Sequence, residues 1–173
     1  QRVYVHKDIY ETFLGALKGK VEALVVGDPL DEATDVSALI AQTDTARVSE
    51  WISQAVKGGA RLITGGDTNA DGVLRPSVLA DTTDGMDVCL KEVLGLLVSV
   101  ISYDNFDEAL KRANDTAFGL QAAIFTKDIS RALKAARVLD FGGVLINETP
   151  TYRADNMPYG GLRDSGNTKE GPA

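Results

Sequence analysis

Apolar residues recur along the first part of the chain with two different spacings. Residues 2–6 alternate and are β-branched or aromatic at every second position, which is typical of a strand. From Lys7 the spacing becomes helical, and the turn residues Gly27, Asp28 and Pro29 end this predicted helix. One stripe of apolar side chains defines it: Ile9, Phe13, Leu14, Leu17, Val21 and Leu24.

A second predicted helix follows the acidic, irregular stretch 28–40. Thr43 or Asp44 is its candidate N-cap, and Gly58-Gly59 ends it. Its apolar side consists of Val48, Trp51, Ile52, Ala55 and Val56. Residues 61–64 then have the pattern of a short strand, and residues 76–80 are compatible with an extended segment.

The second half of the chain alternates strands with amphipathic helices. Residues 97–101 are nearly all apolar, which favours a strand covered on both faces. Helices are predicted from Asn105 and from Asp128, each followed by a strand, at 120–125 and at 143–146. This alternation predicts an α/β layered fold with a largely parallel sheet flanked by helices.

Domain organisation is predicted to be simple. The length of 173 residues suits one domain, so residues 1–173 are expected to form a single unit. The tail 147–173 is rich in Gly and Pro and is expected to be loop-rich.

Composition excludes several function classes. The net charge is −7 and no basic patch interleaves with aromatic residues, which argues against nucleic acid and against an anionic membrane surface as partners. No apolar run approaches the roughly 18 residues of a membrane-spanning helix, and no signal peptide is visible. The single cysteine favours a reducing, cytoplasmic setting.

Candidate metal and nucleophile motifs are incomplete. Asp67, Asn69 and Asp71 match the start of a calcium loop, but Val78 stands where that loop needs a bidentate Glu, so a polar turn is favoured. His6, the only histidine, is interpreted as a strand-end surface residue, and no metal site is expected. Cys89 has apolar neighbours and is interpreted as a buried thiol in preference to a nucleophile.

Nucleotide-binding fingerprints are absent as well. No G-x-G-x-x-G follows a strand, and no phosphate-binding loop of the Walker type is present. The residues alone therefore indicate an α/β domain without a complete catalytic constellation.

Five segments, in this order and spacing, resemble the aldehyde dehydrogenase superfamily. Residues 1–6 resemble the strand that follows the catalytic cysteine of that family, and residues 26–29 resemble its V-G-D-P turn. Residues 102–115 are similar to its Y-x-x-x-x-E-A-x-x-x-A-N stretch, and residues 118–126 to its G-L-x-A-x-V-F-T strand. Residues 157–166 are similar to its P-[FY]-G-G-x-K-x-S-G segment.

The resemblance implies an oxidoreductase and a three-layer, Rossmann-like catalytic domain. Members oxidise an aldehyde to a carboxylic acid with NAD or NADP, through a cysteine thiohemiacetal. The nucleophilic Cys, the general-base Glu and the cofactor-binding domain are expected upstream of Gln1, so the chain is expected to be a truncated catalytic domain without catalytic residues of its own. Alone it is expected to be inactive and to bind no cofactor.

The resemblance also assigns cofactor contacts. Residues 91–96 resemble the family's E-[IV]-F-G-P motif, which gives Glu92 the role of holding the nicotinamide ribose hydroxyls. Leu94 stands where the family has Phe beside the nicotinamide, and Leu96 where it has Pro. Leu94 keeps apolar bulk without an aromatic face, and Leu96 leaves φ unrestricted.

The aldehyde pocket is assigned to the loop 149–155 and the aromatic that follows it. Tyr152 and Arg153 belong to this loop, and Tyr159 matches an aromatic of the pocket wall. The Arg153 guanidinium is suited to anchoring a carboxylate or phosphate of a substrate. Pairing with Asp155 or with a carbonyl at the end of the sheet is the structural alternative.

Two other functions stay open. Leu94 and Leu96 motivate a non-catalytic scaffold or interaction domain derived from the same fold, excised or engineered. Cys89 as a substitute nucleophile is the weaker one. The partner expected for the parent enzyme is a small aldehyde, and a homodimer is left open, since removal of a neighbouring domain exposes apolar surface.

Overall fold

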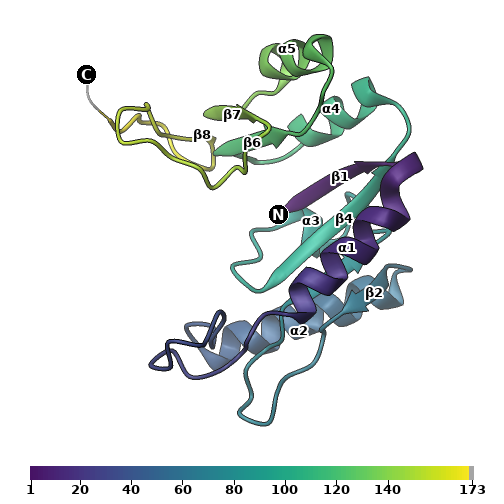
Figure 1. Cartoon of the computed structure of the whole chain (residues 1–173), viewed down its shortest axis with the longest axis vertical. Coiled ribbons are helices and arrows are strands. Elements are labelled where there is room, and N and C mark those ends of the chain that lie inside the picture. Colours follow the sequence, from purple (N-terminus) through teal and green to yellow (C-terminus); the bar gives the residue numbers. More distant parts are fainter. Residues whose placement is uncertain (172–173) are drawn as a thin grey trace. The chain divides into compact units, whose positions relative to one another are not determined.

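The chain folds into two compact units, each described here by itself. The structure is a computed structural model that describes residues 1–171 (Figure 1). The first unit is Gln1–Asp104, and the second begins at Asn105. Each unit has its own core of buried apolar residues. The single domain expected over residues 1–173 stays a prediction.

A four-stranded sheet forms the centre of the first unit (Figure 1). Its strands lie in the order β1 (Arg2–His6), β4 (Leu97–Tyr103), β3 (Ser77–Ala80) and β2 (Arg61–Thr64). The pairs β1–β4 and β4–β3 are parallel, and only the edge strand β2 is antiparallel to its neighbour. The largely parallel sheet expected from the sequence is therefore confirmed.

Helices cover both faces of this sheet. The 3₁₀ turn Lys7–Ile9 leads into α1 (Tyr10–Glu22), which packs on one face. The helices α2 (Gln42–Lys57) and α3 (Asp87–Leu90) pack on the other. Neighbouring residues of β3 show the two faces, because Val78 joins the cluster with α1 and Leu79 the cluster with α2.

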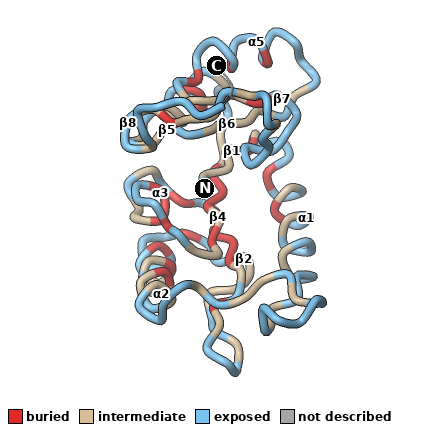
Figure 2. The backbone as a smooth tube through the Cα atoms, turned by 90° about the vertical axis from the view of Figure 1, so that its left-hand side faces the viewer, coloured by how far each residue is buried: buried red, intermediate tan, exposed pale blue. Residues whose placement is uncertain are grey.

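Strand β4 confirms the prediction of a strand covered on both faces. Leu97 and Ile101 belong to the cluster with α2 and α3, whereas Val100 belongs to the cluster with α1. Figure 2 shows the buried positions along β4. Alternation of side chains across a pleated strand covered on both faces explains why residues 97–101 are nearly all apolar.

The end of β3 is fixed by a buried tyrosine. Tyr10 Oη donates to Asp81 Oδ1 at 2.9 Å and accepts from the Asp81 amide at 2.9 Å. Burial raises the pKa of Tyr10 to about 12. Asp81 also binds Arg61 Nε at 2.7 Å, so this network ties α1 to the ends of β2 and β3.

The second unit is smaller and contains two short sheets. Strands β6 (Gln121–Ile124) and β7 (Gly143–Ile146) are parallel, and β5 (Phe118–Gly119) pairs antiparallel with β8 (Leu162–Arg163). Its helices are α4 (Phe106–Asn114) and α5 (Ile129–Val138). Leu110, Ala135 and Leu139 form the buried core of this unit.

The structure shows where three of the predicted helices begin. Asn105 accepts from the amides of Asp107 and Glu108, and Asp128 accepts from those of Ser130 and Arg131, so each residue caps the helix that the sequence predicts to begin there. The prediction of Thr43 or Asp44 as the cap of α2 is wrong. That helix begins at Gln42 after Ala41, whose side chain makes no capping bond, and Asp44 lies in its first turn.

The tail is mostly loop, as expected, with more pairing than the sequence indicates. Strand β8 and an isolated antiparallel bridge between Tyr159 and Glu170 lie within it. The part of the predicted tail at residues 172–173 lies outside the described residues.

Candidate functional site

The segment after α3 places Glu92 and Leu94 on the surface of the first unit. Lys91 follows α3 in an extended conformation, with φ −105° and ψ 158°. In the next three residues exposure alternates. Val93 is 4% exposed and belongs to the core beside α2, whereas Glu92 and Leu94 on either side of it are exposed. The buried residue therefore anchors the two that face outward.

This segment, residues 91–96, is called here the cofactor turn because of the role assigned to it from the sequence. Three contacts fix its backbone. Arg47 NH1 donates to the Val93 carbonyl oxygen at 2.8 Å, and the Ser77 amide donates to the Leu96 carbonyl oxygen at 2.8 Å. A Cβ on Gly95 would lie 2.7 Å from Val48 Cγ2, so only glycine allows this close approach. The turn is held to α2 and to the start of β3.

Leu94 adopts a conformation that leucine rarely takes. Its φ is +44°, in the left-handed region, and its side chain is 65% exposed. A residue with a Cβ persists in this region only when its surroundings impose it. The contacts on either side of Leu94 impose it here and leave an apolar side chain exposed.

Glu92 presents a carboxylate without competing partners. Within residues 1–171 no hydrogen bond or ion pair of its side chain is formed. An ionised carboxylate has two acceptor oxygens and suits two neighbouring hydroxyl groups. Its exposure and free acceptors fit the ribose-binding role assigned to Glu92 from the sequence.

The predicted substrate residues lie in the second unit. Tyr152 and Arg153 are exposed, and Tyr159 is half-buried. The Arg153 guanidinium lies over the Tyr159 ring, 4.6 Å from its centroid, and its NH2 is 3.9 Å from Glu170 Oε2. Glu170 is the residue whose backbone pairs with Tyr159, with N···O distances of 2.8 and 2.6 Å. Arg153 and Tyr159 are thus brought together.

One sequence interpretation of Arg153 needs correction. The structural alternatives for Arg153 are pairing with Asp155 or with a carbonyl at the end of the sheet, but the carboxylate that lies near Arg153 is that of Glu170, which the bridge to Tyr159 positions. The pair is long and both side chains are largely exposed, so it holds the guanidinium weakly. The cofactor turn and this loop belong to different units, and each is described by itself.

Cys89 and His6, considered from the sequence as a nucleophile and as a metal ligand, both lie in ordinary structural positions. Cys89 is 8% exposed within the core beside α2, which confirms the interpretation as a buried thiol. His6 ends β1, where its Nδ1 accepts from the Asp8 amide at 3.3 Å. Among residues 1–171 no group of three or more His, Cys, Asp or Glu side chains is suited to holding a metal ion. The same residues contain no helix long and apolar enough to cross a bilayer.

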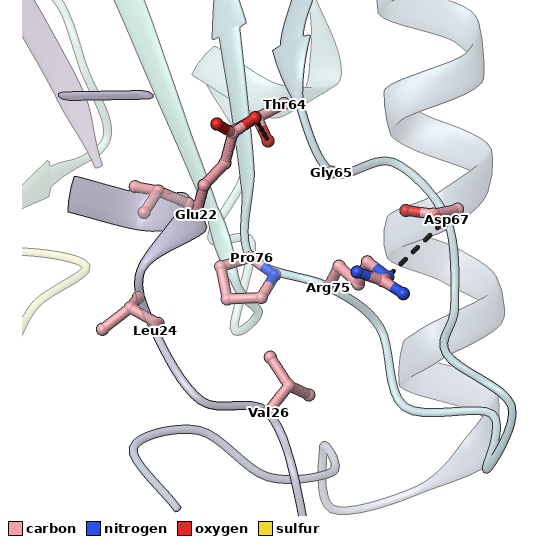
Figure 3. A pocket seen from close by; sticks show the side chains of 9 residues that line it. Glu22, Leu24, Val26, Thr64, Gly65, Asp67, Arg75 and Pro76 are labelled. Atoms are coloured by element: carbon pink, nitrogen blue, oxygen red, sulfur yellow. Dashed lines mark hydrogen bonds and ion pairs between the residues drawn. The ribbon is translucent and has the colours of Figure 1, made fainter. Parts of the chain in front are cut away.

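A shallow groove of about 360 Å³ lies between the end of α1 and the residues that flank the β2–β3 connection (Figure 3). Its polar side chains bind one another: Arg75 Nε lies 3.5 Å from Asp67 Oδ2, and Thr64 donates to Glu22 at 3.0 Å. None of the predicted site residues lines it.

The residues 67–75 form the polar turn that the sequence favoured over a calcium loop. Asn69 Oδ1 accepts from the amides of Asp71 and Val73, at 3.0 and 2.9 Å. Its side-chain oxygen is thus used to close the turn.

Sequence reasoning missed Arg47 altogether. It contacts a carbonyl 46 residues away in the sequence, and nothing in the local pattern of α2 distinguishes it from an ordinary helix-surface arginine.

Comparisons with known proteins identify the relatives of this chain. The model of the aldehyde dehydrogenase family matches residues 1–173. The 3-sulfolactaldehyde dehydrogenase of Priestia aryabhattai is 46% identical over 172 residues, and the lactaldehyde dehydrogenase of Methanococcus aeolicus is 37% identical over 170. These alignments cover 99% and 98% of this chain and 36% of each relative, so the chain spans about a third of their length.

Solved structures agree with this match. Aldehyde dehydrogenase 21 from Physcomitrella patens, in complex with the reaction product succinate, has a TM-score of 0.94 at 36% identity, over 99% of this chain and 35% of that one. The glyceraldehyde-3-phosphate dehydrogenase GapN from Methanocaldococcus jannaschii, complexed with NADP, has a TM-score of 0.93 at 35% identity, over 98% and 37%. The chain belongs to the aldehyde dehydrogenase family.

Proposed function

We propose that this chain supplies part of the active site of an NAD(P)-dependent aldehyde dehydrogenase that oxidises an aldehyde to a carboxylic acid. In this proposal the cofactor turn binds the nicotinamide ribose, and the loop with Arg153 and Tyr159 lines the aldehyde pocket. The observation that carries the proposal is the Glu92 carboxylate, exposed and unpaired among the described residues on a turn fixed to the core.

The role of each residue of the cofactor turn follows from its chemistry. Glu92 accepts hydrogen bonds from the two ribose hydroxyls, and the buried Val93 holds its backbone in place. Leu94 offers an exposed apolar side chain to the nicotinamide side of the site. When bound, NAD or NADP takes up the hydride that leaves the substrate. The chain's own residues position that cofactor, and the nucleophile is supplied from outside them.

Charge at Arg153 favours an aldehyde with an acid group. The guanidinium is 44% exposed, and the carboxylate near it among residues 1–171, that of Glu170, is distant enough to be displaced. Two relatives are named after aldehydes that bear an acid group, 3-sulfolactaldehyde and glyceraldehyde-3-phosphate. A third was solved in complex with the reaction product succinate. Others are called lactaldehyde or betaine aldehyde dehydrogenases, so an anionic substrate is part of the proposal only.

A first experiment uses the chain of residues 1–173 by itself. We expect no turnover with NAD or NADP and a panel of aldehydes, since its only cysteine, Cys89, is 8% exposed and lies in the core. NAD(P)H formation is followed by absorbance against a heat-treated control. Turnover above that control would contradict the assignment of the nucleophile to residues outside this chain.

A second experiment tests Glu92 in a working enzyme. Residues 1–173 replace the matching segment of the Priestia aryabhattai enzyme, and the hybrid is assayed with and without Glu92→Gln. Loss of the charge weakens charge-assisted hydrogen bonds to the ribose, so kcat/KM for the cofactor is expected to fall about tenfold. The matched control is Glu32→Gln, since Glu32 is also exposed and without a bonded partner among the described residues. Equal kcat/KM values for the two variants would refute the ribose role.

The same hybrid tests the substrate class. Arg153→Met is expected to lower kcat/KM for an aldehyde that bears an acid group about tenfold, relative to a neutral aldehyde of similar size. A parallel loss for both aldehydes would show that Arg153 acts on the loop and not on the substrate. A cytoplasmic location, expected from the sequence, stays a prediction, and a homodimer stays an open possibility.

A further inference from the structure

We propose that Arg47 is a positioning residue for the cofactor turn: it fixes the peptide group between Glu92 and Leu94 through the Val93 carbonyl. What the turn then binds rests on the proposed function. The claim about the turn itself does not.

The Arg47 side chain is held on three sides. Its NH1 donates to the Val93 carbonyl oxygen at 2.8 Å, and its NH2 donates to Asp44 Oδ1 at 3.2 Å. Its guanidinium carbon lies 4.8 Å from the centroid of the Trp51 ring. Asp44 and Trp51 come from the same helix, α2, at spacings that place all three side chains on one face. Two residues of α2 itself therefore orient the guanidinium toward the turn.

Trp51 also contacts the beginning of the cofactor turn. Lys91 Nζ lies 5.4 Å from the centroid of its ring and binds Asp87 at 2.9 Å. Cations over an aromatic ring are attracted to it. The indole therefore links α2 to the first residue of the turn, while Arg47 links α2 to its third residue.

The position of the accepting carbonyl explains why this bond matters. The Val93 carbonyl and the Leu94 amide form one peptide group, and Leu94 directly after it has a φ of +44°. A leucine in the left-handed region returns to ordinary conformations unless the adjoining peptide plane is held. A hydrogen bond from a charged donor is stronger than one from a neutral donor. Arg47 therefore maintains the orientation that exposes Glu92 and Leu94 on the two sides of the buried Val93.

A second arginine provides a matched control. Arg131 lies three residues after Asp128, with its Nε 3.7 Å from the carboxylate, and its guanidinium lies 5.6 Å from the centroid of the Phe106 ring. It has the same kind of acidic and aromatic neighbours as Arg47. It differs in one respect, because no hydrogen bond joins its side chain to a backbone carbonyl among residues 1–171.

The experiment measures backbone order parameters by ¹⁵N relaxation on the full chain and its variants. In the wild type and in Arg131→Met, the order parameters of the Leu94 and Gly95 amides are expected to be about 0.85, the value of a rigid backbone. In Arg47→Met they are expected to fall below about 0.6, while the amides of α2 stay rigid. Arg47→Lys keeps a cation and a donor but loses the planar fork that donates to Val93 and Asp44 and lies over Trp51, so it is expected to restore only part of the order.

The outcomes distinguish a positioning role of Arg47 from a role in folding, and both from the ribose-binding role of Glu92. Rigid Leu94 and Gly95 amides in Arg47→Met would overturn the proposal, as would an equal loss of order in Arg131→Met. If Arg47→Met does not fold, Arg47→Gln takes its place, since its side chain is too short to make the same bond. Glu92→Gln is expected to leave the order parameters unchanged. A failure of the ribose role appears only in the cofactor kcat/KM of the hybrid enzyme, so the two claims fail separately.

Discussion

The cofactor turn and the loop 149–159, each considered by itself, are held in place by different interactions. The cofactor turn is fixed by a side chain inserted into the core, Val93, and by a charged hydrogen bond from Arg47. The loop 149–159 is held mainly at its far end, where Gly160 lies against Gly142, and its middle is exposed. There, within the part of the chain that the structure describes, Arg153 is held by the ring of Tyr159 and by a long ion pair with Glu170.

This difference matches the two tasks proposed for them. A cofactor has one fixed ribose, so a carboxylate that binds it benefits from a backbone that does not move. Aldehydes differ in size and charge, and the relatives of this chain have names that cover several of them. An exposed loop tolerates substitution and suits that variation. Burial, more than residue type, therefore distinguishes the fixed cofactor turn from the variable loop.

The largest effect is expected at the base of the loop. In Gly142→Ala the added methyl would coincide with the Gly160 carbonyl oxygen, so the backbone has to shift. Overpacking of this kind is expected to lower the free energy of unfolding by about 3 kcal/mol, measured by urea unfolding followed by circular dichroism. Gly15→Ala is the control, because nothing lies within 4 Å of its Cβ in α1, and it should gain stability. A neutral Gly142→Ala would mean that the loop end is not fixed.

A somewhat smaller effect is expected in the cofactor turn. Val93 is 4% exposed, and Val93→Ala removes two buried methyl groups. The expected loss is about 2 kcal/mol of unfolding free energy, followed by the fluorescence of Trp51, which packs against the same core cluster. Val25→Ala, at a position 49% exposed, should change stability by less than about 0.5 kcal/mol. Equal effects of the two substitutions would remove the claim that the core holds the turn.

Relief of strain at Leu94 gives a small effect of opposite sign. Glycine adopts a φ of +44° without penalty, so Leu94→Gly is expected to raise the unfolding free energy by roughly 0.5 kcal/mol after the entropic cost of glycine. Leu94→Ala keeps the strain and removes the same exposed side chain. If alanine stabilises as much as glycine, the gain comes from the lost apolar surface and not from the backbone.

The smallest change in stability is expected in the middle of the loop. Arg153→Met loses an exposed pair and a ring contact, and the unfolding free energy should change by less than about 0.5 kcal/mol. Arg137→Met, an exposed position of α5 without a bonded partner among the described residues, is its control. A loss above about 2 kcal/mol at Arg153 would show that the loop is as firmly held as the turn.

Much of the fold follows from local patterns in the sequence. The strands over 61–64 and 143–146 have the predicted bounds, and the strand predicted over 120–125 is one residue shorter at each end. The helices predicted from Asn105 and Asp128 begin there because each of these side chains accepts hydrogen bonds from two amides of the first turn. Asp44 is not the cap because the helix begins two residues before it, at Gln42. The Asp44 side chain instead pairs with Arg47.

The site is less predictable than the fold, for a physical reason. The resemblance picks out Glu92 and Arg153, but the contacts that position them are not local. The bond from Arg47 to Val93 joins α2 to the cofactor turn, and the bridge between Tyr159 and Glu170 places the carboxylate near Arg153. Short pairings such as β8, with two residues, leave no periodic pattern to detect.

The most direct test of the central claim is a crystal structure of the hybrid enzyme with NADH bound. The proposal predicts both Glu92 carboxylate oxygens, or one oxygen twice, within hydrogen-bond distance of the ribose hydroxyls, about 2.6–3.0 Å. It also predicts that the Arg47 bond to the Val93 carbonyl is retained. A ribose bound by other side chains, with Glu92 in solvent beyond about 4 Å, would contradict the role assigned to the cofactor turn.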